Sequence, residues 1–382
     1  MKTFKFGQLL SKEDICDRQK EVRLLNGVCK TNGRAVVYGR RRFGKSSVVK
    51  NVILEDFLDK NKKSLAIYAD LFQLDSMEDM TLRLQIGFEQ ALSKRVGIKT
   101  FLNSIQNYLK HFRVEITMDS LSGAPTIAFA GQHMKDEKSL SEMFLAIKDL
   151  SKEYRTLLVL DEFQDIKRIQ GLEARLRSEI QSLNRTAVIL LGSKKHILRE
   201  IFHDESKPFY GFGIDVEFKE IARADWLPYI EQRFAPCKLT IEQEGVIEIC
   251  NLMRDVPNSI QELCQWITLS GQTGFLTIPR IHDDLSDLIE NKSSRYIERL
   301  ASLSIKEKMV LIATAKVEPV SSITSTKFLQ ATRVSATATR ATILRLTDQG
   351  ILDLTENGYF ITDPIFRLFL VRRFSDSGNN SR

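Results

Sequence analysis

The stretch "VVYGRRRFGKSSVV" (residues 36–49) joins the pattern of a buried strand to that of a phosphate-binding loop. It satisfies GxxxxGK[ST] at Gly39, Gly44, Lys45 and Ser46. The glycines let the backbone turn its N–H groups toward phosphate oxygens, the lysine neutralises phosphate charge, and the serine hydroxyl ligates magnesium. The following helix directs its positive end at the same anion. The stretch therefore predicts a site for ATP and Mg²⁺.

Three consecutive arginines lie inside this loop, although such loops hold phosphate mainly through the backbone. We expect their side chains to point away from the phosphates and to raise the positive potential that captures ATP. We also hypothesise that at least one pairs with an acid on a lid or a neighbouring subunit; solubilisation of an exposed loop is the alternative. The residues expected to surround the nucleotide are Gly39, Arg40, Arg41, Arg42, Phe43, Gly44, Lys45, Ser46 and Ser47.

Acidic residues end a second apolar segment, "LLVLDEFQ" (157–164). A parallel sheet would deliver Asp161 and Glu162 to the carboxyl-terminal edge, where doubly wound folds bind ligands. We predict that Asp161 holds Mg²⁺ through water and that Glu162 orients and deprotonates the attacking water. The alternatives are a solvated turn and a nucleotide-binding domain that barely hydrolyses. At the tip of "LLGSKK" (190–195), Ser193 either reports the γ-phosphate or caps the next helix.

Apolar strand patterns alternate with helical ones over 34–220, which predicts an α/β fold with a doubly wound parallel sheet. We expect an amphipathic helix over about 11–31 with Ile15 on its apolar face, a helical stretch over 76–112, and a β-hairpin at 113–131. "IDVEFKEI" (214–221) is a candidate edge strand.

The second half of the chain is expected to be helical over 222–300 and then to follow the order helix, helix, helix, hairpin, helix. That order is typical of a winged helix-turn-helix, with Asn-Gly at the hairpin turn. The predicted division is a P-loop ATPase domain, a helical lid, a winged helix and a disordered tail, at 1–221, 222–302, 303–374 and 375–382.

Winged helices bind DNA when the third helix enters the major groove. In the helix expected over 335–349, Thr339, Ile343 and Leu346 face the core, whereas Ala338 and Ala341 face outward. The outward face is mostly small, so DNA and a protein partner stay as alternatives, with little base specificity in either case. The residues expected to contact DNA are Lys327, Arg333, Thr337, Arg340 and Arg345.

Composition narrows the class of protein. The 382 residues carry 56 basic and 49 acidic side chains, a net charge of +7 that permits nucleic acid without requiring it. Five dispersed cysteines without a CxxC pair read as reduced thiols, with Cys250 and Cys264 on helices, and the scattered histidines predict no structural zinc. No apolar run approaches a membrane span and the N-terminus lacks a signal peptide, so we expect a cytoplasmic protein.

The order of several motifs resembles the archaeal-type ATPases, a prokaryotic branch of the AAA+/STAND P-loop proteins. These motifs are "GRRRFGKSS", "LVLDEFQ", "LLGS", "KPFYGFG" and "DVPNSIQELCQWI". The closing "LTENGYFITDPIFRLFL" (354–370) is similar to the winged-helix end of that family, so the resemblance covers nearly the whole chain. It implies nucleotide roles for Lys45, Ser46, Asp161 and Glu162.

The resemblance carries further implications. "DRQKEVRLL" (17–25) looks like the family's helix against the adenine, which puts Asp17 and Arg18 near the base. The chain departs from the family at Phe212, where an arginine often follows "YG". Pro257 matches the family's "GxP" lid position, but Val256 precedes it and a glycine is expected further upstream. The arginines that are candidates for a finger are Arg199, Arg223 and Arg254.

Three hypotheses follow for function. The first is an ATP-hydrolysing switch whose nucleotide state controls the winged helix. The second is a winged-helix DNA-binding regulator with a mainly structural nucleotide site. The third is an oligomeric ATP-driven motor or loader acting on DNA, which would need an arginine finger between subunits.

Overall fold

A computed structural model of the chain describes residues 3–93, 114–118, 125–129 and 137–375. The chain divides into two units, which we describe separately. The N-terminal unit comprises Leu9–Arg40 and Gly44–Lys219. The C-terminal unit comprises Met1–Gln8, Arg41–Phe43 and Glu220–Arg382, so three residues of the phosphate loop belong to it.

Five parallel strands form the sheet of the N-terminal unit, in the order β2-β5-β6-β1-β7. Their bounds are Arg34–Gly39 (β1), Ser64–Asp70 (β2), Arg155–Asp161 (β5), Thr186–Gly192 (β6) and Ile214–Phe218 (β7). The expected α/β fold with a doubly wound parallel sheet is confirmed. The strand β7 lies at an edge, as predicted, and β1 lies between β6 and β7.

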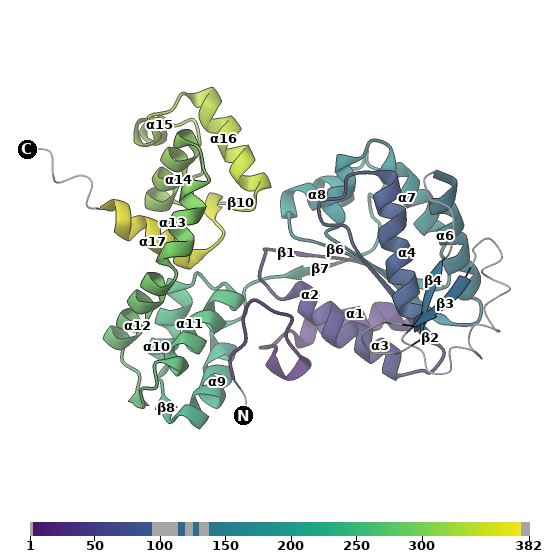
Figure 1. The fold of residues 1–382 in the computed structure, drawn as a ribbon, viewed down its shortest axis with the longest axis horizontal. Coiled ribbons are helices and arrows are strands. Elements are labelled where there is room, and N and C mark those ends of the chain that lie inside the picture. The colour runs from purple at the N-terminus through teal and green to yellow at the C-terminus, as the bar shows by residue number, and fades with distance from the viewer. Residues whose placement is uncertain (1–2, 94–113, 119–124, 130–136, 376–382) are drawn as a thin grey trace, which may run out of the picture. The chain divides into compact units, whose positions relative to one another are not determined.

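Alternate residues of these strands face opposite layers of helices. The buried side chains of Leu65, Leu158 and Leu190 share one apolar core with residues of α4, α6, α7 and α8. Figure 1 shows α1 and α3 on the other side of the sheet from α4, α7 and α8. Burial on both faces explains why β5 and β6 read as continuous apolar runs. The helices are α1 (Gln19–Lys30), α2 (Lys45–Val48), α3 (Glu55–Asp59), α4 (Met77–Ser93), α6 (Glu137–Leu150), α7 (Leu172–Gln181) and α8 (Lys195–His203).

The first helix begins later than predicted. Residues Lys12–Asp14 form a short 3₁₀ turn, and α1 starts at Gln19, so Ile15 is not on it. Asp17 and Arg18 have φ of 54° and 75°, a left-handed backbone that interrupts any helix running through them. The apolar period alone did not reveal this break.

The insertion predicted at 113–131 is confirmed as an antiparallel pair outside the main sheet. Its strands are β3 (Val114–Met118) and β4 (Pro125–Phe129). The Ser-Gly-Ala-Pro turn falls almost wholly outside the described residues, as does the part of the expected 76–112 helix beyond α4. A π-helical segment, Val49–Leu54, joins α2 to α3.

Helices dominate the first part of the C-terminal unit. Two short strands, Leu239–Thr240 (β8) and Gly274–Phe275 (β9), pair in parallel between them. Cys250 and Cys264 are buried on helices, as predicted. The helices are α9 (Arg223–Phe234), α10 (Gln243–Leu252), α11 (Pro257–Leu269), α12 (Ile278–Asn291) and α13 (Ser293–Ala301).

The rest of this unit has the predicted order of a winged helix. Its elements are α14 (Ile305–Val317), α15 (Thr326–Thr332), α16 (Ala336–Asp348), β10 (Leu352–Thr355), β11 (Gly358–Ile361) and α17 (Pro364–Ser375). The hairpin turn consists of Glu356 and Asn357, since Thr355 pairs with Gly358. Gly358 has φ 125° and its backbone lies so close to Val320 that a Cβ would be 2.4 Å from that carbonyl oxygen. The predicted tail lies outside the described residues from 376 onward.

Across the described ranges, none of the helices combines the length and the apolar character that a membrane crossing requires.

Candidate functional site: a phosphate loop with two carboxylates

The phosphate loop connects the end of β1 to the start of α2. Its two glycines are needed for different reasons. A Cβ on Gly39 would lie 2.6 Å from the Phe218 carbonyl oxygen, so the neighbouring strand leaves no room for a side chain. Gly44 has φ 85°, the left-handed conformation that glycine adopts without strain. The backbone geometry therefore requires glycine at both glycine positions of the motif.

Lys45 is buried within this loop, 7% exposed. Its Nζ donates to the carbonyl oxygens of Gly39 (2.8 Å) and Arg40 (2.9 Å). A buried ammonium needs such acceptors because desolvation without them is costly. These bonds hold the cation at the centre of the loop. The neighbouring Ser47 hydroxyl accepts a hydrogen bond from the Leu10 N–H at 3.1 Å.

Ser46 and Asp161 meet although 115 residues separate them in sequence. The Ser46 hydroxyl donates to Asp161 Oδ2 at 3.0 Å, and Asp161 Oδ1 accepts from the Glu162 N–H at 2.8 Å. A serine hydroxyl beside a carboxylate is an oxygen donor set that suits Mg²⁺, which takes few protein ligands and completes its shell with water and phosphate. The residues present therefore fit this metal.

Tyr68 completes this cluster, and our sequence reading did not include it. From near the end of β2 its hydroxyl donates to Asp161 Oδ2. Burial raises the pKa of Tyr68, and the Asp161 carboxylate raises it further, so the phenol stays protonated and donates. Lys50 Nζ lies 4.0 Å from the centre of the Tyr68 ring. A tyrosine near the end of an apolar strand carries no sequence signal that distinguishes it from a core residue.

Glu162 lies beside Asp161 in a left-handed conformation with φ 51°. Its Oε2 accepts two hydrogen bonds, from Gln164 Nε2 at 2.5 Å and from Ser193 Oγ at 2.9 Å. Gln164 also accepts the Ser193 N–H at 3.2 Å through its Oε1, so its amide bridges the tips of β5 and β6. These donors fix the orientation of the carboxylate. The role of Gln164 was missed because "DEFQ" reads equally well as a solvated turn.

Ser193 had two alternative roles in the sequence reading. The residue that caps α8 is Lys194, and no side chain makes a capping hydrogen bond there. The Ser193 hydroxyl instead donates to Glu162, and the residue is 3% exposed. The geometry thus favours a link to the carboxylate over a helix cap.

Two of the three loop arginines contact the winged helix within the C-terminal unit. Arg42 has φ 68°, and its Nη1 lies 3.4 Å from Asp363 Oδ2. The guanidinium of Arg41 lies against Gly350, where a Cβ would be 2.0 Å from Nη1. Phe43 is buried, 1% exposed. The hypothesised acid partner thus exists, and it lies in the 303–374 region rather than on the lid.

Residues implied to lie near the base have definite surroundings. Arg18 is 3% exposed, and its Nη2 donates to the Lys219 carbonyl oxygen at 2.8 Å. Its guanidinium also pairs with Glu21 and lies 5.0 Å from the centre of the Phe218 ring. Asp17 is exposed. Arg18 therefore ties the start of α1 to the end of β7.

The family-related positions are also occupied by structural contacts. Phe212 is buried in an aromatic cluster with Phe202 and Phe209. Arg223 makes two hydrogen bonds to the Asp255 carboxylate, at 3.0 and 2.9 Å. Three other positions are placed as follows: Arg254 pairs with Glu318, Arg199 is exposed on α8, and Pro257 is the first residue of α11.

The expected faces of the third winged-helix helix are largely confirmed. Thr339, Ile343 and Leu346 are fully buried, whereas Ala338 is half-buried rather than exposed. Arg345 lies 3.5 Å from the Glu307 carboxylate. The candidate DNA-contacting residues that are exposed are Lys327, Arg333, Thr337, Arg340 and Arg345.

Comparison with known proteins supports the same architecture. The family described as "Probable winged helix domain" matches residues 294–372. The fold is similar to the Walker-type ATPase PABY2304 of Pyrococcus abyssi, with TM-score 0.60 and 20% identity over 94% of this chain and 97% of that chain. The search of curated proteins gave no match.

Two proteins of Aeropyrum pernix have related folds. The ORC2 protein, solved in ADPNP–ADP complexes, has TM-score 0.51 and 16% identity over 98% of this chain and 100% of that chain. The ORC1 protein, solved in complex with DNA, has TM-score 0.50 and 15% identity over 94% and 93%. The chain thus has the fold of a P-loop ATPase followed by a winged helix, and its resemblance to archaeal-type ATPases is confirmed at the level of fold.

Proposed function

We propose that this chain is a Mg²⁺-dependent ATPase of slow turnover whose nucleotide state controls the winged helix. The observation that carries the proposal is the convergence of Ser46, Asp161 and Glu162 beside the loop that holds Lys45. These four side chains come from two segments that lie 115 positions apart in the chain. Nothing in a purely structural loop requires a buried lysine, an oriented carboxylate and a serine–aspartate pair together.

Each residue has a task that follows from its contacts. Lys45 would exchange its carbonyl partners for phosphate oxygens, which neutralises their charge. Ser46 and Asp161 would hold Mg²⁺, which when bound supplies electrostatic stabilisation of the phosphates. Glu162, oriented by two donors to Oε2, would accept the proton of the attacking water. Ser193, bonded to Glu162, would sense the γ-phosphate through that carboxylate.

We infer four parts that serve this cycle. They are the ATPase domain at 1–221, a lid at 222–302, the winged helix at 303–374 and a tail at 375–382. Arg42 supports coupling between them, because it belongs to the phosphate loop in sequence and pairs with Asp363 before α17. A nucleotide that reorders the loop would change that pair.

The partner that we propose for the winged helix is duplex DNA, bound with little sequence specificity. Exposed cations on α15 and α16, including Lys327 and Arg340, support phosphate contact. The small outward residues Thr337 and Ala341 offer few groups to read bases. The Aeropyrum pernix ORC1 protein, which has a related fold, was solved with DNA.

The experiment measures Mg²⁺-ATP turnover with and without duplex DNA for the parent, Lys45→Ala and Glu162→Gln. We expect both variants to lose hydrolysis, with Glu162→Gln still binding ATP. Tight DNA binding that ignores nucleotide, with no turnover in the parent, would favour the regulator with a structural site. Strong stimulation by DNA would favour a motor. An Arg185→Ala variant, at an exposed loop position of the N-terminal unit, controls for loss of one positive charge.

A further inference from the structure

A cavity of about 630 Å³ lies entirely within the C-terminal unit. Its walls come from the N-terminal residues Phe6 and Gly7, from α11, from α13 and the residue before it, from Asp363 just before α17 and from the loop residue Arg42. The charged residues that line it are Arg42, Lys292, Arg295, Arg299, Glu262 and Asp363. This volume is within the range of small-molecule sites.

The charges of the cavity do not balance. Lys292 pairs with Glu262, and Arg42 lies 3.4 Å from Asp363. Among the residues that the structure describes, neither Arg295 nor Arg299 has an ion-pair partner. Two cations therefore face the cavity beyond what its carboxylates neutralise.

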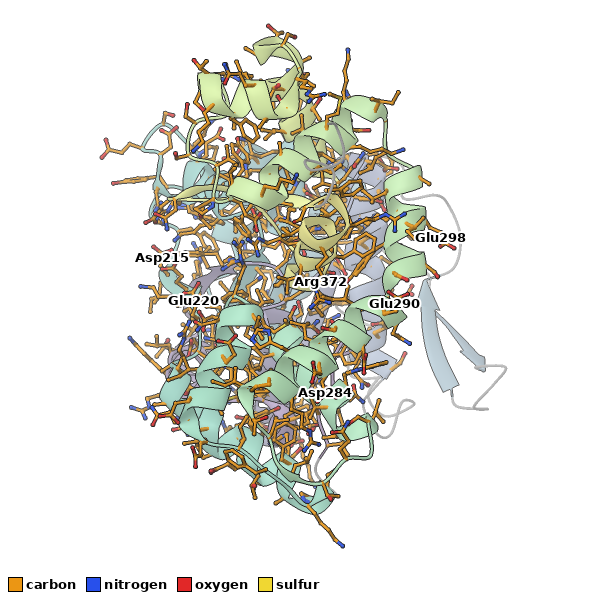
Figure 2. All side chains as sticks on the ribbon, turned by 90° about the vertical axis from the view of Figure 1, so that its left-hand side faces the viewer. Asp215, Glu220, Asp284, Glu290, Glu298 and Arg372 are labelled. Carbon is orange, nitrogen blue, oxygen red and sulfur yellow. The ribbon has the colours of Figure 1, made fainter. Side chains whose placement is uncertain are left out.

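The arrangement on α13 works against the stability of the free protein. Arg295 and Arg299 are four residues apart, a spacing at which like charges repel on a helix. Glu298, the acidic residue of the same helix, does not neutralise the two arginines. It is exposed, and in Figure 2 it points away from the body of the unit. A bound anion between the two arginines would remove this repulsion.

Arg299 is the more buried of the two arginines. Burial lowers its pKa, and the neighbouring Arg42 and Arg295 lower it further, against the opposing effect of Asp363. Its guanidinium lies 5.1 Å from the centre of the Phe366 ring, which fixes its position at the cavity wall. Positive charge is thus concentrated where water is partly excluded.

Hydrogen-bond donors that are not cations also line the cavity. The pKa of Tyr296 is raised, chiefly by burial, so its hydroxyl is protonated at neutral pH and lies 3.5 Å from Asp363 Oδ2. The Asn258 side chain is held by the Gly7 N–H, which donates to its Oδ1 at 2.9 Å and leaves its amide group as a donor. Arginine forks beside neutral donors are the groups that recognise phosphoryl oxygens.

We propose that this cavity is a second anion site, for a small ligand with one or two phosphoryl groups, separate from the site at Lys45. Arg295 and Arg299 bind the phosphoryl oxygens, and the ligand competes with Asp363 for Arg42. Because Arg42 lies two residues before Gly44, occupancy would change the tip of the phosphate loop. The assignment of the cavity as an anion site stands without the proposed ATPase activity.

The test uses full-length Lys45→Ala protein, so that the loop lysine contributes no binding. Isothermal calorimetry with inorganic pyrophosphate at physiological salt should still show one site. Arg295→Gln in this background should weaken that site about tenfold, the loss expected for hydrogen bonds to a charged group. Arg295→Lys, which keeps the charge but not the fork, should restore part of the affinity, and Arg185→Gln, an exposed loop control, should leave it unchanged.

Two results would overturn the assignment. The first is that Lys45→Ala alone abolishes pyrophosphate binding, which would show a single site. The second is that Arg295→Gln, and also the pair Arg295→Gln with Arg299→Gln, bind as tightly as their parent. Arg295 is exposed and makes no ion pair with the described residues, so its substitution should not lower the melting temperature, and a loss of binding can then be interpreted.

Discussion

Replacing Tyr68 by phenylalanine tests whether the carboxylate of Asp161 is oriented for magnesium. The substitution removes one hydroxyl and keeps the ring that packs beneath Lys50. Asp161 then retains the Ser46 hydroxyl at 3.0 Å and the Glu162 N–H at 2.8 Å. No buried donor is left without its partner, so the change isolates one hydrogen bond.

The size of the effect follows from the chemistry of that bond. A hydrogen bond to a charged group contributes about 1.5–3 kcal/mol. Loss of a residue that orients a metal ligand typically costs about 10–100-fold in metal affinity or activity. At 1.4 kcal/mol for each factor of ten, the two estimates agree. Because burial raises the pKa of Tyr68, its hydroxyl donates throughout the neutral pH range and the effect should not depend on pH there.

The assay is phosphate release at saturating ATP while the Mg²⁺ concentration is varied. Tyr68→Phe should raise the half-saturating Mg²⁺ concentration by about 10–100-fold, with little change in nucleotide affinity when Mg²⁺ is removed. Tyr210→Phe is the matched control, because among the described residues its exposed hydroxyl bonds only Glu205, at 3.3 Å, on the surface. A shift in Tyr68→Phe no larger than in Tyr210→Phe would refute the assignment of Asp161 as the oriented metal ligand.

Three further predictions concern other parts of the molecule. Asp363→Asn keeps an oxygen for the backbone N–H groups at the start of α17 but loses the ion pair with Arg42 and the carboxylate oxygen that the Tyr296 hydroxyl contacts at 3.5 Å. Urea unfolding should show a loss below about 1 kcal/mol, whereas Asp363→Ala should lose about 1 kcal/mol more. Gln164→Leu removes the amide bridge to the carboxylate base, and turnover should fall about tenfold with unchanged ATP affinity; equal turnover would contradict it. Burial raises the pKa of Cys29 and Cys250 to about 12, so alkylation of native protein at pH 8 should modify half-buried Cys237 first. Because unfolded thiols ionise near pH 8.5, those two cysteines make stability fall as pH rises above that value, measurable as a falling melting temperature.

The sequence predicted those parts of the site that lie in contiguous patterns. A strand, a glycine-rich loop and a helix are adjacent in the chain, and so are the apolar strand and the acid pair at 161–162. The alternation of apolar strands with helices was enough for the sheet, because parallel strands buried on both faces read as continuous apolar runs. The break before α1 was missed since apolar spacing says nothing about left-handed residues such as Arg18.

Contacts between distant segments could not be predicted in the same way. Tyr68 looks like any aromatic residue of a core strand, and only the pairing of β2 with β5 brings it to Asp161. The partner of Arg42 lies 321 positions later, in a Thr-Asp-Pro sequence that reads simply as a helix cap. A helix cap accounts for Asp363 Oδ1, which accepts from the backbone of α17, but not for Oδ2, which pairs with Arg42.

Both carboxylates that meet the phosphate loop are built on this same plan. Asp161 Oδ1 accepts from a backbone N–H, and its Oδ2 accepts from the Ser46 and Tyr68 hydroxyls. Asp363 Oδ1 accepts from backbone N–H groups of α17, and its Oδ2 lies beside Arg42 and the Tyr296 hydroxyl. The backbone bond holds each carboxylate in place when the loop residue moves away. The two loop residues are four positions apart but belong to different units. We therefore propose that an anion which changes the loop backbone alters one contact in each unit, as a nucleotide switch would require.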